Sequence, residues 1–496
     1  MYICSVLLNI NNMSKKNFNQ KKMKNVRTFF MMLTVFGLSI GSALAQTVYV
    51  GPRANIHDDP ENGIYVSPNG NDATANGSIG KPYKSINTAL AAAAPGNRTI
   101  ILRNGTYCEG INVRVDCPNI TIKSAKGEWA VIDLTAYNSG HDQDSGVYFR
   151  PDSSGSKLQS VEVKGGFYAV GLETTWDWGI MYYPTRYGAS NIIIEDCILH
   201  HSRNDVIKIK PNCDNITIRY NEIHHSGQTF VGDPLTPYGE KNAEGIDNVN
   251  GDNMLVQYNY IHDICSTGVY AKGGATDAVI EYNRIEHAYG AGIQIGFDTS
   301  PEFFDTTVNP SYYENIRGVA HNNLIIDTGW EGIGLYASRD AHVYNNTVVN
   351  VANGPGKYHS AIYFGIATQD EDLVSGRPKN INPNIHNNIV SQPNSIIPPM
   401  IEIRYIASLS TLLPISLSAL DGKPTMNNNR YYIVGKTAAF TDNRPASPLS
   451  NARLPAWQSH IGGDNGSLEV DPALNAYYIP TNLSCAGMGI QSLLYP

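Results

Sequence analysis

Lysines and carboxylates gather in three neighbouring segments near the middle of the 496-residue chain. A lysine can act as a base when nearby cations or burial lower its pKa. Grouped carboxylates can hold Ca²⁺, which takes several oxygen ligands. The candidate base is Lys272, with Lys208 and Lys210 as second choices. The candidate calcium ligands are Asp205, Glu244 and Asp247.

This combination suits the cleavage of a uronate-containing polymer by β-elimination. The reaction requires a cation that neutralises the carboxylate, a base that takes the adjacent proton, and a donor that protonates the leaving oxygen. Gly273 and Gly274 follow Lys272 and leave open space beside it for a substrate. The residues therefore predict a lyase for an acidic polysaccharide, with Ca²⁺ as a candidate cofactor.

Two other interpretations fit the same residues. A glycoside hydrolase would use two carboxylates about 5–9.5 Å apart, for which Glu244, Asp247 and Glu331 are candidates. Glu244 and Asp247 are three residues apart in one expected strand, so their side chains should point to opposite faces. A non-catalytic carbohydrate-binding protein needs none of these groups, and Lys208 and Asp247 would then form a cross-strand ion pair that contributes little.

An internal repeat must position these residues. Segments with an asparagine at one register recur at Ile216–Ile223, Met254–Ile261 and Val279–Ile285, and the spacing from Asn259 to Asn283 is 24 residues. A second, alternating segment follows about ten residues after each asparagine. Two or three short strands in each coil of roughly 22–25 residues are typical of a parallel β-solenoid.

The side chains that follow the repeat are interpreted as structural. The recurring asparagines can bond the turn backbone and the asparagine of the next coil, as in the ladders of stacked sheets. His224, His225, His262 and His287 come just after these turns at one register. We therefore interpret these histidines as ladder residues rather than as a metal cluster.

Aligning the second segments predicts which side chains share a face. Strand residues alternate, so Ile207, Ile246 and Val269 should point inward. The outward row then contains Lys208, Asp247, Tyr270 and Gln294 on successive coils. Adjacent strands lie about 4.8 Å apart, which makes these residues neighbours.

Insertions at residues 228–242 and 297–316 are expected to wall a groove on this face. Tyr238 in the first insertion would stack on a sugar ring, and Tyr270 and Gln294 would contact the substrate from the groove floor.

The N-terminus predicts export. A basic stretch without acids precedes the apolar run Phe29–Ile40 and the small residues Ala43–Ala45. This pattern is typical of a signal peptide, expected at residues 1–45, because the run is too short for a membrane span. Its removal would change the formal net charge from −8 to −14. Such acidity argues against nucleic acid as a partner, and we expect a secreted monomer.

Export permits disulfides. Six cysteines follow the expected cleavage point, and Cys108 with Cys117 flanks one short loop as the best candidate pair. The others follow no metal-ligand spacing and are expected as buried small hydrophobic residues.

The ends of the repeat carry a family resemblance. Ile64–Asp72 predicts a strand, an Ala-rich helix is expected over Ile86–Ala94, and Thr99–Tyr107 begins the coils. This block resembles the N-terminal cap of secreted right-handed β-helix proteins, including polysaccharide lyases of the pectate and alginate type. Trp457–Pro472 resembles their closing segment. The resemblance implies an all-β, right-handed parallel β-helix over residues 46–496, with a cap at about 60–98, coils at about 99–395 and an irregular end at 396–496.

The resemblance also implies an activity. Lys272 with the three carboxylates is similar to the lysine-plus-calcium site of one pectate lyase family, although that family's paired aspartates do not occur here as a contiguous motif. The calcium-free alternative resembles the Lys/Arg pair of alginate and chondroitin lyases, with Arg219 or Arg284 as the substrate-binding partner. We therefore expect a secreted lyase for an acidic polysaccharide, with a glycoside hydrolase and a non-catalytic binder as alternatives.

Overall fold

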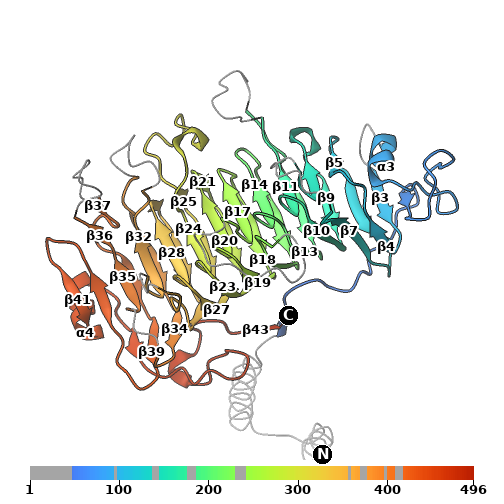
Figure 1. The fold of residues 1–496 in the computed structure, drawn as a ribbon. Helices are drawn as coiled ribbons and strands as arrows, with labels where there is room; N and C mark the ends of the chain where they lie inside the picture. Colours follow the sequence, from blue (N-terminus) through green and yellow to red (C-terminus); the bar gives the residue numbers. More distant parts are fainter. Residues whose placement is uncertain are drawn as a thin grey trace, which may run out of the picture. The chain divides into compact units, whose positions relative to one another are not determined.

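Three long sheets wind around one core in the computed structural model (Figure 1). The structure describes residues 47–93, 98–136, 144–175, 186–228, 242–355, 359–368, 377–395, 399–407 and 417–495. These residues belong to the unit that begins at Thr47. The expected signal peptide, residues 1–45, lies outside them.

Each of the three sheets has twelve strands among the described residues. Sheet 1 consists of β2 Ile64–Val66, β3 Thr99–Leu102, β6 Thr121–Ser124, β9 Lys157–Gln159, β12 Ile193–Glu195, β15 Thr217–Arg219, β18 Leu255–Gln257, β22 Val279–Glu281, β26 Val319–His321, β30 His342–Tyr344, β33 Asn384–His386 and β38 Thr425–Asn427. Sheet 2 consists of β4 Gly105–Tyr107, β7 Ala130–Leu134, β10 Val161–Gly165, β13 Ile198–His200, β16 Glu222–His224, β19 Tyr260–Ile264, β23 Arg284–Ala288, β27 Leu324–Thr328, β31 Thr347–Val349, β34 Ile389–Gln392, β39 Arg430–Ile433 and β42 Leu468–Glu469. Sheet 3 consists of β5 Val113–Val115, β8 Val147–Phe149, β11 Val170–Leu172, β14 Ile207–Ile209, β17 Ile246–Val249, β20 Val269–Lys272, β24 Ile293–Ile295, β28 Ile333–Tyr336, β32 Ile362–Gly365, β35 Ile401–Ile403, β40 Phe440–Asp442 and β41 Leu449–Ala452.

The remaining helices and strands lie outside the three long sheets. They are β1 Thr47–Tyr49 paired with β43 Leu493–Tyr495, the small sheet of β21 Ala275–Thr276, β25 Asn315–Ile316 and β29 Ser338–Arg339, the hairpin of β36 Tyr405–Ile406 and β37 Leu417–Ser418, the helices α3 Ile86–Ala93 and α4 Leu454–Ile461, and the 3-10 turns Pro151–Ser153, Pro301–Phe303 and Leu483–Cys485. None of the helices in the described part of the chain is long and apolar enough to cross a membrane.

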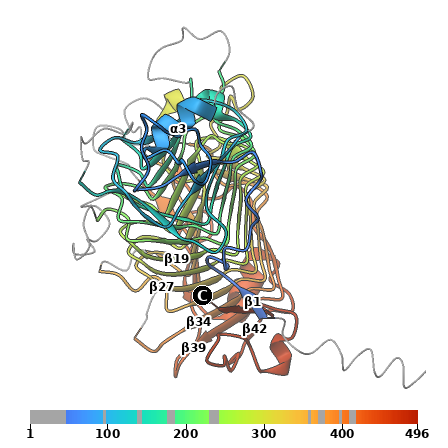
Figure 2. The ribbon, with the colours of Figure 1, turned by 90° about the vertical axis from the view of Figure 1, so that its right-hand side faces the viewer.

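In chain order the coils visit sheets 1, 2 and 3 in turn, as β12, β13 and β14 do before β15 begins the next coil. Neighbouring coils pair in parallel except at the end, where β41 runs antiparallel to β40. Parallel crossovers in one sheet are right-handed. The predicted right-handed parallel β-helix is confirmed, and the coils stack closely behind one another in Figure 2.

Strand alternation fills the core as predicted. Ile207, Ile246, Val269 and Ile293 occupy paired positions on successive strands of sheet 3 and are fully buried. The stack is closed at one end by α3, whose buried face includes Ile86 and Leu90, close to the helix expected at 86–94. The strand row continues through β35, β38 and β42, past the expected end of the coils at residue 395, because long insertions hide the repeat there.

No disulfide links the coils in the described part of the chain. All six cysteines of the described residues are free thiols, so the expected Cys108–Cys117 disulfide is absent. Cys197, Cys213 and Cys265 are buried, in agreement with the expectation for the remaining cysteines.

The asparagine ladder is the most regular feature of the turns. The amide oxygen of Asn259 accepts bonds from the backbone and side-chain nitrogens of Asn221, each at 3.0 Å, and Asn283 and Asn323 repeat the pattern. Asn346, Asn388 and Asn429 extend it. These side chains are buried, so the ladder satisfies turn groups that water does not reach.

We predict that Asn283→Ala lowers the free energy of unfolding by at least about 2 kcal/mol, because each buried partner left unpaired costs about 1–3 kcal/mol. The backbone nitrogen of Asn259 and the carbonyl of Val256 lose partners in this variant. Chemical denaturation measures the loss, with the exposed Asn62→Ala as the control. Equal stability of the two variants would contradict a structural ladder.

Candidate functional site

The outward face of sheet 3 carries the charged row that the sequence predicts. Lys208 on β14 pairs in register with Asp247 on β17, which pairs with Tyr270 on β20. Lys272 at the end of β20 pairs with Val249. Because inward positions hold the isoleucine stack, alternation turns these side chains outward.

Three carboxylates converge beneath this row. One oxygen each from Asp205, Glu244 and Asp247 lies within 4.8 Å of the others, and all three residues are buried. The Glu244 backbone donates to Asp205 at 3.0 Å, and the Ser266 hydroxyl donates to Glu244 at 2.9 Å. The expectation that Glu244 and Asp247 point to opposite faces is therefore wrong. Strand β17 begins at Ile246, so Glu244 lies in the preceding turn, where alternation does not apply.

Lys208 supplies the positive charge of this group. Its ammonium hydrogen-bonds Asp247 and lies 3.3 Å from a carboxylate oxygen of Asp205. Calcium takes about six to eight oxygen ligands, and two of the three carboxylates here already hold an ammonium. The residues therefore fit Lys208 and do not fit a calcium ion while Lys208 is present. Asp205, Glu244 and Asp247 are therefore not proposed as calcium ligands of the native chain.

Burial and charge separate the pKa values of these groups. Burial and the negative charge of Asp205 raise the pKa of Glu244 well above its usual range. Burial opposes ionisation of Asp247 as well, but Lys208 and Lys272 outweigh it and lower the pKa of Asp247. Burial likewise opposes the charge on Lys208, yet Asp247 and Asp205 raise its pKa well above the usual value. The environment therefore favours the charged forms of Lys208 and Asp247 and disfavours ionisation of Glu244.

A groove of about 350 Å³ opens above this charge group, lined by Lys208, Asp247, Lys272, Phe297 and Asp298 among others. The Lys272 ammonium lies 4.5 Å from the centre of the Tyr270 ring and 5.9 Å from that of Phe297. It is 3.8 Å from Asp247.

On the groove floor the two ammonium groups are more exposed than the carboxylates beside them, while half-buried Asp298 lines the wall. The side chains of Lys208 and Lys272 are 18% and 11% exposed, whereas that of Asp247 is 1% exposed. Glu244 has no exposed surface. The groups of this cluster that a ligand reaches first are therefore ammonium groups.

The second predicted insertion forms a wall of this groove. Glu314, at its end, accepts bonds from the backbone of Gly273 at 2.9 Å and from Thr299. Arg377 donates to the same carboxylate at 3.1 Å. Burial raises the pKa of Glu314 to about 7 against these bonds. Glu314 thereby ties the insertion to the backbone next to Lys272. Of the first insertion, residues 229–241, including Tyr238, lie outside the described residues.

Other predicted site residues lie elsewhere. Arg219 is on β15 of sheet 1, 2.6 Å from Glu195. Arg284 is on β23 of sheet 2, 3.0 Å from Glu286. Because Lys272 is on sheet 3, neither arginine is placed to share a substrate with it.

Lys210 and Gln294 lie on the predicted face, but each is bound to a carboxylate of the protein. The Lys210 ammonium lies 3.0 Å from Glu173, beside the groove. Gln294 is next to Tyr270, is fully buried, and donates to Glu331 at 2.7 Å. Tyr270 is fully buried as well, so the expectation that Tyr270 and Gln294 contact the substrate is wrong, and both residues support the floor.

Sequence analysis missed a second polar group farther along sheet 3. His359 lies 2.6 Å from the buried carboxylate of Glu331 and stacks on Trp330, with ring centres 4.7 Å apart. Arg404 donates to the hydroxyl of Tyr363 at 2.9 Å. The available signal was the position of His359, directly before the recurring segment Ser360–Gly365.

Comparisons with known proteins agree with the fold. The family model described as "Right handed beta helix region" matches residues 127–319 and 245–397, which together cover more than half of the chain. The comparison with curated proteins finds no match.

Several solved structures are similar. Pectate lyase Pel9A is 16% identical over 72% of this chain and 82% of its own, with a TM-score of 0.46. The A-module of the Azotobacter vinelandii mannuronan C-5 epimerase AlgE6 is 12% identical over 78% and 94%, with a TM-score of 0.49. PfbA, a surface adhesin of Streptococcus pneumoniae, is 13% identical over 73% and 89%, with a TM-score of 0.45. At these identities the likeness concerns the fold and not the reaction.

We predict that Lys208→Ala creates a calcium site. Removal of the ammonium leaves Asp205 and Asp247 without their cation, and a divalent ion can replace it. Saturating Ca²⁺ should raise the melting temperature of the variant by about 5 °C and leave the native chain unchanged.

The matched control for this experiment is Lys157→Ala, which removes a lysine 3.0 Å from the single buried carboxylate of Glu195. Differential scanning calorimetry with and without chelator measures the shifts. Equal stabilisation of the native chain by Ca²⁺ would show that Lys208 does not take the place of the metal.

Proposed function

We propose that this chain, which belongs to the right-handed β-helix family, is an exported enzyme that cleaves an acidic polysaccharide by β-elimination in the groove on sheet 3. The observation that supports this most directly is the charge of the groove. Lys208 and Lys272 face the cavity, and the carboxylates that hold them are buried. In an acidic protein, exposed ammonium groups on the floor of a groove favour an anionic ligand.

Lys208 is suited to neutralise the substrate carboxylate. The charges of Asp247 and Asp205 hold its pKa high, so it stays an ammonium throughout the reaction. Pairing the uronate carboxylate with this ammonium makes the proton on the adjacent carbon more acidic, because the cation stabilises the charge that develops when the proton leaves.

Lys272 is suited to take that proton. Its distance from Asp247 is 3.8 Å, whereas Lys208 hydrogen-bonds the same carboxylate. Asp247 is therefore compensated mainly by Lys208, which leaves Lys272 the less engaged of the two lysines. As Lys272 takes the proton, the electrons of the C–H bond form the double bond. The C–O bond to the leaving sugar breaks, and the leaving oxygen takes a proton from the protonated lysine or from water.

The same geometry argues against hydrolysis by the buried carboxylates. The oxygens of Glu244 and Asp247 lie within 4.8 Å of one another, close to the about 5–5.5 Å between the carboxyl groups of a retaining glycosidase, but neither carboxylate is accessible. Glu244 has no exposed surface, and Lys208 covers Asp247. A sugar in the groove therefore meets the ammonium groups before either carboxylate.

We predict that the purified chain releases unsaturated products from an acidic polysaccharide and that Lys272→Ala slows this release by at least about 100-fold, the usual contribution of a positioned base. Absorbance of new double bonds is followed on pectate, alginate and chondroitin, with a neutral glycan for comparison. The matched control is Lys81→Ala, an exposed lysine of the N-terminal cap.

New reducing ends without double bonds would contradict elimination and favour a hydrolase. Binding of a polysaccharide without either product would favour the non-catalytic carbohydrate binder.

A further inference from the structure

Paired histidines follow two neighbouring strands of sheet 2. β13 ends at His200 and is followed by His201, and β16 ends at His224 and is followed by His225. His200 and His224 are partners in the sheet, and their rings stack with centres 4.6 Å apart. The rings of His201 and His225 stack at 4.8 Å. The four imidazoles therefore form two short columns.

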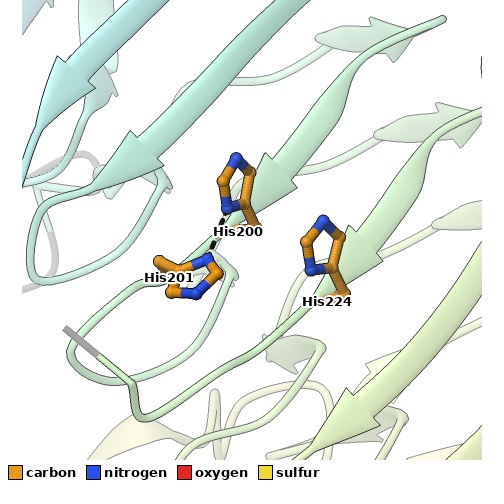
Figure 3. Close-up of side chains that lie close together, drawn as sticks. All are labelled: His200, His201 and His224. Atoms are coloured by element: carbon orange, nitrogen blue, oxygen red, sulfur yellow. Dashed lines mark hydrogen bonds between the residues drawn. The ribbon is translucent and has the colours of Figure 1, made fainter. Parts of the chain in front are cut away.

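The backbone conformation brings the two rings of each pair together. His201 and His225 adopt the left-handed conformation, with φ of 54° and 55°. This turn brings the second ring of each pair back toward the first, as Figure 3 shows for His200 and His201. The two Nδ1 atoms are 2.5 Å apart in the first pair and 2.6 Å apart in the second.

Two Nδ1 atoms at this distance must share a proton or a cation, because their lone pairs face each other. A carboxylate oxygen of Glu162 lies 3.2 Å from Nε2 of His200. This contact favours the proton on Nε2 and leaves the Nδ1 lone pair of His200 directed at His201. A carboxylate behind the outer ring nitrogen is the usual arrangement around a histidine that binds metal.

We propose that His200, His201 and His224 form a binding site for a divalent transition-metal ion of the Zn²⁺ class. One ring nitrogen from each lies within 4.8 Å of the others, and Figure 3 shows the three rings side by side across two strands. Imidazole nitrogen suits Zn²⁺, Ni²⁺ and Cu²⁺, whereas Ca²⁺ and Mg²⁺ prefer oxygen. With Zn–N bonds of about 2.0–2.1 Å, tetrahedral ligands lie about 3.3 Å apart, so binding requires the His200–His201 pair to open by less than about 1 Å. The His224 ring, which stacks on His200 with an interplanar angle of 9°, must also turn its nitrogen toward the same ion.

The next coil limits the site to these two strands. His262, the partner of His224, lies 2.7 Å from Asp263 and 3.2 Å from Glu222. Both of its ring nitrogens are engaged by carboxylates, which makes His262 a flanking residue rather than a ligand. His200 and His201 are buried and His224 is partly exposed, so an ion enters from the His224 side.

The test is metal binding by the full chain, without a histidine tag and after treatment with a chelator. Isothermal titration with ZnCl₂ should detect one tight site per chain, and CaCl₂ should give no heat at it. Co²⁺, as a spectroscopic probe, should show the absorption of an imidazole-ligated ion. His200→Ala and His224→Ala should abolish both signals. Glu162→Gln, which changes only the carboxylate behind His200, should weaken Zn²⁺ binding by about 10–100-fold.

The control is His321→Ala, which removes a histidine of sheet 1 that also stacks in a column and lies 3.0 Å from a carboxylate. This variant should bind Zn²⁺ as the native chain does. Circular dichroism of each metal-free variant separates loss of the site from loss of the fold. Absence of Zn²⁺ binding and of the Co²⁺ spectrum in the native chain would overturn the proposal, as would undiminished affinity in folded His200→Ala and His224→Ala.

Discussion

The register between neighbouring coils is the constraint on which the rest of this molecule depends. Buried isoleucines on the inside of sheet 3 and the asparagine ladder in the turns both require each coil to stack directly on the last. With register fixed, residues far apart in sequence become neighbours at the spacing of adjacent strands, about 4.8 Å. Lys208 and Asp247 meet in this way, and so do His200 and His224. The molecule therefore builds sites by repeating a position rather than by folding distant loops together.

Buried charge decides what the groove can recognise. Three carboxylates under the floor would strongly destabilise one another if all were ionised, because desolvated charges require partners. Two features reduce this repulsion: burial and Asp205 raise the pKa of Glu244, and the Lys208 ammonium lies beside Asp247 and Asp205. The consequence appears at the surface. The cavity presents ammonium groups although the chain carries a formal net charge of −8. Glu314 then ties the wall of the groove to the backbone beside Lys272.

The features that depend on the periodicity of the repeat could be predicted from the sequence. The β-helix, the capping helix, the inward and outward rows of sheet 3 and the asparagine ladder all follow from spacing and alternation. Most failures lie where a residue leaves a strand. Glu244 joins Asp247 because it precedes β17, and alternation does not extend into a turn. Arg219 and Arg284 were a different failure, because they lie on other strands of their coils, β15 and β23, and so fall on sheets 1 and 2. The histidine pairs depend on a left-handed residue after each strand, and periodicity alone does not reveal that conformation. The contact between His359 and Glu331 joins two neighbouring coils whose loops differ in length. The sequence spacing therefore did not reveal it.

The central claim is that Lys208 recognises the carboxylate of an acidic sugar in the groove on sheet 3, beside the base Lys272. The most direct test is a crystal structure of the Lys272→Ala chain, which should bind without turnover, soaked in turn with oligogalacturonate and an alginate oligosaccharide. We expect a sugar ring in the groove beside Phe297, with its carboxylate about 3 Å from the Lys208 ammonium. An oligosaccharide bound on another face, or one whose carboxylates point away from Lys208 into solvent, would contradict this account.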